Sequence, residues 1–107
     1  MSDSCKVTVN PGVCRLNTVI TANLIPGTME VHVEIKSDCP NVRKMGEQID
    51  NVSAYEEIAK KMFDTVVYRF ANDILPHPAC PVPSAVMKAI EGASGLCLKK
   101  NVTFDIE

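Results

Sequence analysis

The sequence predicts a single α+β domain, a two-layer sandwich in which an antiparallel β-hairpin and a C-terminal strand pack against about three helices. Its 107 residues suit one domain, whose usual size is ~100–200 residues. Apolar residues alternate with polar ones toward both ends of the chain, whereas in the middle they recur every three or four residues. We therefore expect residues 1–107 to form strands first, helices next and a strand last.

Two half-buried strands are expected over residues 16–24 and 29–36, where apolar and polar side chains alternate. Between them, Pro26 presets φ at the first turn position, and Gly27 tolerates a positive φ at the second. The two strands should therefore form a β-hairpin.

The register of this hairpin brings two cysteines together. A tight turn centred on residues 26–27 pairs Leu24 with Met29, and the same register sets Cys14 opposite Cys39. Opposed residues of antiparallel strands have Cα atoms ~4.5–5.5 Å apart, which suits a shared metal ion or a disulfide formed on oxidation. The spacing leaves both options open.

A first helix should start at Asp38-Cys39-Pro40 and run to about Ile49, because proline is tolerated in the first turn. Its residues Val42, Met45 and Ile49 form one apolar stripe.

A second helix should start with a capping box, in which Ser53 accepts a hydrogen bond at the cap and Glu56 reaches back. Apolar residues then recur every four positions over 58–74. Pro76 ends this helix, and a break near residues 64–65 is allowed.

A proline-rich linker over residues 76–83 leads into a third helix of about three turns, whose apolar side runs from Val82 to Ala93. Gly95 is its expected C′ residue. Clean alternation over 102–106 then predicts the last strand.

Charge and hydropathy exclude two classes of partner. The net charge is −2, and the chain has no Trp, two Tyr and three Phe, so it lacks the basic surface and stacking aromatics of a nucleic-acid binder. No apolar run approaches the ~18 residues of a membrane span. The segment 1–6 has no cationic stretch followed by an apolar core, so we expect no secretory signal and a cytoplasmic location.

Five cysteines are many for a cytoplasmic domain of this size, which can bury a hydrophobic core without disulfide or metal cross-links. Cys39 and Cys80 each precede a proline at a predicted helix start, where a thiolate is stabilised. Together with Cys14 they form a candidate site, whereas we expect Cys97 in the core and Cys5 in an exposed tail. Thiolates select Zn²⁺ or an iron–sulfur cluster over magnesium or calcium.

Two further side chains are candidates for a fourth ligand. His77 lies three residues before Cys80 in the proline-rich linker, and Asp38 directly precedes Cys39. His32 stands between two glutamates on a polar strand face, so we expect it to be solvated.

Three stretches of the sequence carry a family resemblance: residues 13–15, residues 31–39 and residues 77–91, the last with Ser-Ala-x-x-Lys-Ala-Ile-Glu after a cysteine. The chain resembles the NifU-type iron–sulfur scaffold domains and the small prokaryotic three-cysteine domains known as TSCPD. The resemblance implies that Cys14, Cys39 and Cys80 converge and bind zinc or a transient iron–sulfur cluster.

The sequence departs from the scaffold pattern at two places. Arg15-Leu16 follows the first cysteine where scaffolds have Gly-Asp, and His77 is three residues from Cys80 where scaffolds have an adjacent histidine. These departures affect cluster transfer more than metal binding.

The leading hypothesis is a non-enzymatic metal-binding module with Cys14, Cys39 and Cys80 as ligands, completed by His77, Asp38 or an outside group. One alternative is a thiol redox or persulfide-handling protein with a resolving disulfide. The other is a structural or interaction domain with inert cysteines. Expected partners are a protein in metal or sulfur transfer and, through an exposed sheet edge, a second copy.

Overall fold

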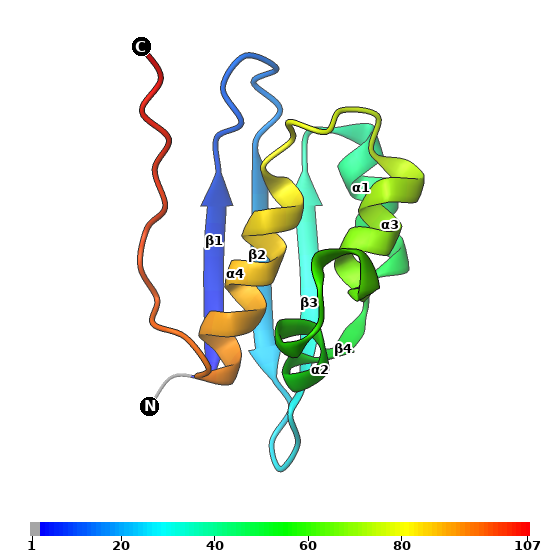
Figure 1. Cartoon of the computed structure of the whole chain (residues 1–107), viewed down its shortest axis with the longest axis vertical. Coiled ribbons are helices and arrows are strands. Elements are labelled where there is room, and N and C mark those ends of the chain that lie inside the picture. The colour runs from blue at the N-terminus through cyan, green and yellow to red at the C-terminus, as the bar shows by residue number, and fades with distance from the viewer. Residues whose placement is uncertain (1–2) are drawn as a thin grey trace.

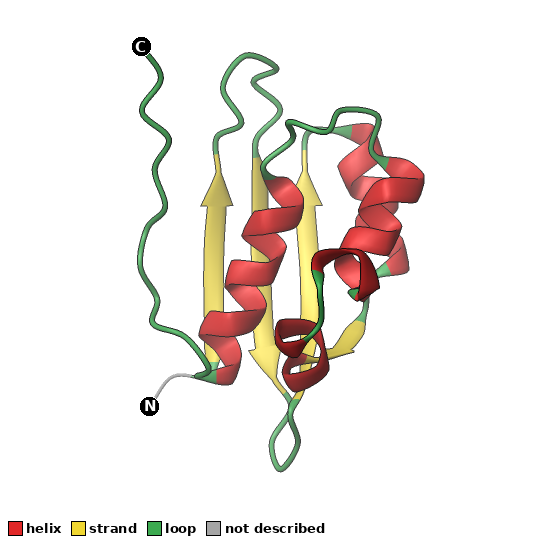
Figure 2. Ribbon diagram, in the orientation of Figure 1, coloured by secondary structure: helices red, strands yellow, loops and turns green. Residues whose placement is uncertain are grey.

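The computed structural model describes residues 3–107; Met1 and Ser2, which begin the segment expected to carry no secretory signal, lie outside the described residues. Four antiparallel strands form one sheet in the order β1-β2-β3-β4, and helices cover one of its faces (Figures 1 and 2). The strands are β1 (Ser4–Val9), β2 (Thr18–Leu24), β3 (Glu30–Ser37) and β4 (Asn51–Ser53). The predicted α+β class is confirmed.

The β2–β3 hairpin is confirmed, but its predicted register was wrong. Leu24 pairs with Val31 instead of Met29. The connecting loop is longer than a tight turn, because the Ile25 N–H donates to the Glu30 carbonyl over 2.9 Å and closes the hairpin there. A shift of two residues keeps every side chain on its predicted face, since side chains alternate with period two.

The helices are α1 (Pro40–Gln48), α2 (Ala54–Ala59), a single-turn 3₁₀ helix (Met62–Asp64), α3 (Val66–Ile74) and α4 (Val82–Ser94). The first and third predicted helices match α1 and α4, and Gly95 follows α4 with a φ of +79°. α4 packs on β1 and β2, α1 packs on β3, and α3 lies against both α1 and α4.

The second predicted helix is divided, with α2 ending at Ala59 and α3 starting at Val66, so the interruption begins earlier than the break allowed near residues 64–65. Ser53 caps α2 by accepting from the Glu56 N–H, as predicted. Glu57 is buried and turns its carboxylate toward the start of α3, where it accepts from the N–H groups of Val66 (2.8 Å) and Val67 (3.1 Å). This carboxylate satisfies two N–H groups that a helix start leaves without intrahelical partners.

The strand predicted over residues 102–106 is absent, because residues 96–107 form neither helix nor strand in this structure and are exposed. The sheet instead contains β1, which the sequence analysis placed in a tail, and the three-residue β4. Alternation marks an amphipathic extended segment, but a strand also needs a hydrogen-bonding partner.

The core lies between the sheet and the helices. Its sheet side is formed by Ile20, Ala22, Val31 and Val33, and its helix side includes Val42, Met45, Ile49, Val67, Val86, Ala89 and Ile90.

The predicted locations of the two remaining cysteines, Cys5 and Cys97, were both wrong. Cys5 is half-buried in β1 against Gly92 of α4, and Cys97 is exposed after α4 has ended.

None of the helices that the structure describes is long and apolar enough to cross a lipid bilayer.

Candidate functional site

Three connections meet at one end of the sheet, and each carries one cysteine. They are the β1–β2 loop with Cys14, the β3–α1 junction with Cys39 and the α3–α4 loop with Cys80 (Figure 1). We call this the cysteine end. The first two connections are joined by a hydrogen bond, in which the Asp38 N–H donates to the Asn17 carbonyl over 2.9 Å.

Cys39 sits at the N-cap of α1, in an extended conformation directly before Pro40. Its backbone N–H donates to the Ser37 hydroxyl at 3.0 Å, and this hydroxyl also contacts the Thr18 hydroxyl at 2.7 Å. Arg43 of α1 donates to the Ser37 carbonyl at 3.0 Å. These bonds fix the backbone at Cys39, whose half-buried side chain packs against the core.

Cys80 lies in the proline-rich loop before α4, where its N–H donates to the His77 carbonyl at 3.1 Å. Its side chain is half-buried and packs against the core. Cys14 differs from both, because it lies in an exposed loop in which Gly12 and Arg15 have positive φ angles of 85° and 59°.

The electrostatics of Cys80 connect the three thiols. Burial raises the pKa of the Cys80 thiol, the Val82 backbone N–H at the start of α4 opposes this, and the neighbouring Cys39 and Cys14 raise the pKa further. Cys39 and Cys14 are therefore both neighbours of Cys80. The expectation that a helix start would favour the Cys80 thiolate was wrong in its net effect, because burial outweighs the helix N–H group.

All five predicted site residues lie on the connections of the cysteine end. Asp38 shares the β3–α1 junction with Cys39, His77 shares the α3–α4 loop with Cys80, and both side chains are exposed. The predicted pairing of Cys14 with Cys39 across the hairpin is wrong, since β2 begins only at Thr18. Within residues 3–107, no group of three or more His, Cys, Asp or Glu side chains is arranged to hold a metal ion.

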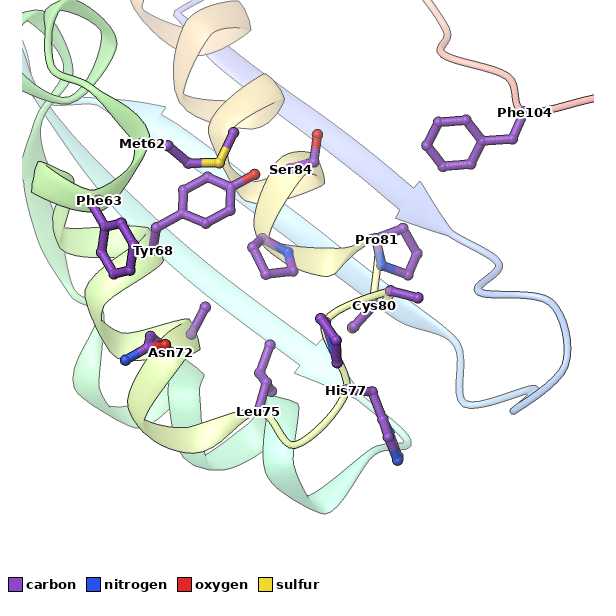
Figure 3. Close-up of a pocket in the computed structure, with 14 residues that line it drawn as sticks. Met62, Phe63, Tyr68, Asn72, Leu75, His77, Cys80, Pro81, Ser84 and Phe104 are labelled. Atoms are coloured by element: carbon purple, nitrogen blue, oxygen red, sulfur yellow. The ribbon is translucent and has the colours of Figure 1, made fainter.

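A mainly apolar cavity of about 620 Å³ lies beside Cys80, and the sequence analysis missed it (Figure 3). Its lining includes Met62, Tyr68, Leu75, His77 and Cys80 from the helices and loops. Phe104 of the C-terminal segment also contributes. The cavity is lined by residues of the 3₁₀ helix, α3, the proline-rich loop and the start of α4, and no local sequence pattern predicts how these segments pack.

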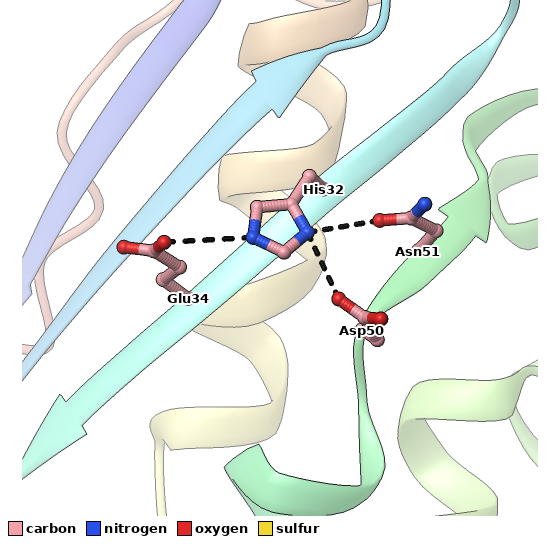
Figure 4. A network of polar contacts seen from close by, with 4 residues as sticks. All are labelled: His32, Glu34, Asp50 and Asn51. Carbon is pink, nitrogen blue, oxygen red and sulfur yellow. Dashed lines mark hydrogen bonds and ion pairs between the residues drawn. The ribbon is translucent and has the colours of Figure 1, made fainter.

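A second polar cluster surrounds His32 on β3 (Figure 4). Its Nδ1 lies 2.9 Å from Oδ1 of Asn51 and 2.9 Å from Oδ1 of Asp50, and its Nε2 lies 3.5 Å from Oε1 of Glu34. The hydrogen bond with Asn51 raises the pKa of His32, burial opposes it, and the charges of Asp50 and Glu34 raise it further. Of the three partners of His32, the sequence pointed only to Glu34, which lies two residues further along the same face of β3. Asp50 and Asn51 were missed because β4 was not predicted.

Fold and site together define a small α+β domain with three cysteines at one end of an antiparallel sheet. The chain belongs to a family described as Family of unknown function (DUF6951), which matches residues 5–106. Neither the curated proteins nor the solved structures contain a significant match to the chain. The resemblance to TSCPD and NifU-type domains stays a prediction.

Proposed function

We propose that Cys14, Cys39 and Cys80 bind one soft metal centre, a zinc ion or an iron–sulfur cluster, and that the domain is a non-enzymatic metal-binding module. The observation that carries this proposal is the convergence of three cysteine-bearing connections at one end of the sheet, where Cys39 and Cys14 both contribute to the raised pKa of the Cys80 thiol. A bound cation would deprotonate its thiol ligands and offset the repulsion among the resulting thiolates.

Loading the centre needs a local rearrangement, because the described residues offer no ready-made ligand group. Cys39 and Cys80 are held by backbone hydrogen bonds, so the exposed loop of Cys14 is the part that would close over the metal. The fourth ligand would come from His77, from Asp38 or from a partner. Zinc sites in proteins are usually four-coordinate, which leaves one position for this group.

The raised pKa of the Cys80 thiol favours metal binding over the redox alternative in which Cys80 attacks as a thiolate. A nucleophilic cysteine needs a lowered pKa at neutral pH, whereas a metal ion deprotonates its own thiol ligand on binding.

We further propose that the domain acts in the cytoplasm, where thiols stay reduced, and exchanges metal or sulfur with a protein partner. Its net charge of −2 gives no attraction to nucleic acid, which supports a protein partner over a polynucleotide.

The test is metal analysis of protein purified without oxygen, combined with its ultraviolet–visible spectrum. We expect bound zinc or iron in the wild type, visible absorption only with an iron–sulfur cluster, and loss of the metal in each Cys→Ser variant at positions 14, 39 and 80. Cys97→Ser is the matched control, since Cys97 is an exposed cysteine outside the cysteine end. The proposal fails if wild type holds neither metal and the apo protein binds neither with micromolar affinity.

A further inference from the structure

The sheet has an edge strand whose outer side pairs with no strand among residues 3–107. β1 occupies this edge (Figure 2). On its helix-covered face, Cys5 and Val7 are half-buried at the border of the core, and on its open face Lys6 is exposed. The exposed edge of a β-sheet is a template for a further strand.

The C-terminal segment has the pattern of a strand that lacks a sheet. Val102, Phe104 and Ile106 alternate with polar residues, and these apolar residues are 59%, 76% and 89% exposed. In an extended conformation, all of them would lie on one face. Three large apolar side chains are thus mostly exposed on a segment that forms neither helix nor strand, although Phe104 also borders the cavity beside Cys80.

We propose that residues 102–107 of one copy of the chain add to β1 of a second copy as an antiparallel fifth strand. Reciprocal exchange of the two segments then forms a two-fold symmetric dimer, in which the same contact occurs twice. This interface is independent of the metal proposal.

The side chains of the two segments match in the antiparallel register that pairs residues 102–107 with the whole of β1. Phe104 then lies opposite Val7, and Val102 lies opposite Val9, so apolar side chains meet on the helix-covered face. On the open face, the same register sets Asp105 directly opposite Lys6. Apolar contact and charge complementarity therefore agree on one register.

The chain's own C-terminal segment cannot adopt this register. It leaves α4 at the end of the sheet where β1 begins and runs beside β1 in the same direction (Figure 1). Lys99 there donates to the Ser4 carbonyl at 2.6 Å, which is a side-chain contact and not a strand pairing. Pairing within one chain would be parallel, and the parallel register that matches all the apolar residues sets Thr103 opposite Lys6. The antiparallel strand must come from another copy.

The connecting residues are long enough for this exchange. Residues 96–101 form neither helix nor strand, and six extended residues span up to roughly 20 Å. The segment can thus leave its own β1 and reach a neighbouring copy while α4 stays in place.

The first test is the molar mass in solution, measured by sedimentation and light scattering over a range of concentrations. We expect the wild type to form a dimer and a variant truncated after residue 101 to be monomeric. The truncated variant should keep its fold, checked by circular dichroism, because every deleted residue is exposed.

Charge reversal tests the register and the exchange between copies. Lys6→Glu and Asp105→Lys should each raise the dimer dissociation constant by about tenfold, because like charges then face each other at both contacts. A mixture of the two variants should recover wild-type affinity as a heterodimer, since one contact carries a reversed pair and the other the original pair. Lys36→Glu and Asp73→Lys are exposed controls away from the interface and should change nothing.

Three results would overturn the proposal: a wild type that is monomeric over the whole accessible concentration range, a dimer that survives the truncation, or a mixture of charge variants no tighter than each variant alone.

Discussion

Replacing Glu57 by glutamine should destabilise the fold by about 3 kcal/mol, because its buried carboxylate holds the start of α3. α3 in turn leads into the loop that carries Cys80. Glu57 therefore connects the stability of the helical layer to the position of the cysteine end.

The magnitude follows from two hydrogen bonds. The carboxylate accepts from the N–H groups of Val66 and Val67 at 2.8 and 3.1 Å, and hydrogen bonds to a charged group contribute ~1.5–3 kcal/mol each. Glutamine keeps one acceptor oxygen but turns an NH₂ group toward the other N–H. It also removes a negative charge from a helix start, which costs a further ~0.3–1 kcal/mol.

The assay is urea and thermal unfolding followed by circular dichroism, in which the melting temperature should fall by roughly 12 °C. Glu56→Gln is the matched control, because the side chain of Glu56 is exposed and the change should stay within ~0.5 kcal/mol. Equal effects of the two substitutions would refute the role assigned to Glu57.

Three further perturbations test other parts of the structure. The pKa of His32 is raised in the folded protein, so its contribution to stability should be complete below about pH 6.5 and disappear as the pH rises through the pKa of the folded state. His32→Gln should therefore be less stable than the wild type at acidic pH only. An equal loss of stability at alkaline pH would contradict this role of the His32 charge. In metal-free protein at neutral pH, iodoacetamide should label the exposed Cys97 before Cys80, whose thiol is half-buried and has a raised pKa. If mass spectrometry shows the reverse order of labelling, Cys80 is an activated thiol and this prediction is wrong. Gly92→Ala should destabilise the fold by about 1–3 kcal/mol despite the higher helix propensity of alanine, because the added Cβ would lie 2.6 Å from the Cys5 Sγ. Adding Cys5→Ala should restore part of the lost stability. Unchanged thermal stability of Gly92→Ala alone would refute the contact.

Local patterns in the sequence predicted the elements that are stabilised locally. The hairpin, α1 and α4 follow from alternation, an N-terminal proline and a C-terminal glycine, and each lies where it was expected. The hairpin register was missed because it depends on how many residues the loop uses, and one further pair of loop residues shifts every pairing. The two ends of the chain were exchanged in role: residues 4–9 and 102–106 both alternate, but only the first segment pairs with β2.

The candidate site was predicted in composition but not in geometry. The sequence singled out Cys14, Cys39 and Cys80, and the fold brings their connections to one end of the sheet. The route differs from the expected one, because the convergence comes from the sheet order and from α4 returning across β1 and β2, not from opposed positions in a hairpin. The cavity beside Cys80 and the network around His32 depend on contacts between distant segments, which no local pattern contains.

The most direct test of the central claim is titration of the metal-free protein with cobalt(II) under anoxic conditions, because thiolate-to-cobalt charge transfer reports sulfur ligands directly. We predict a charge-transfer band that saturates at one metal site per chain, weakens in each Cys→Ser variant at positions 14, 39 and 80, and is unchanged in Cys97→Ser. A spectrum without thiolate charge transfer, or one equally strong in all of these variants, would contradict the account.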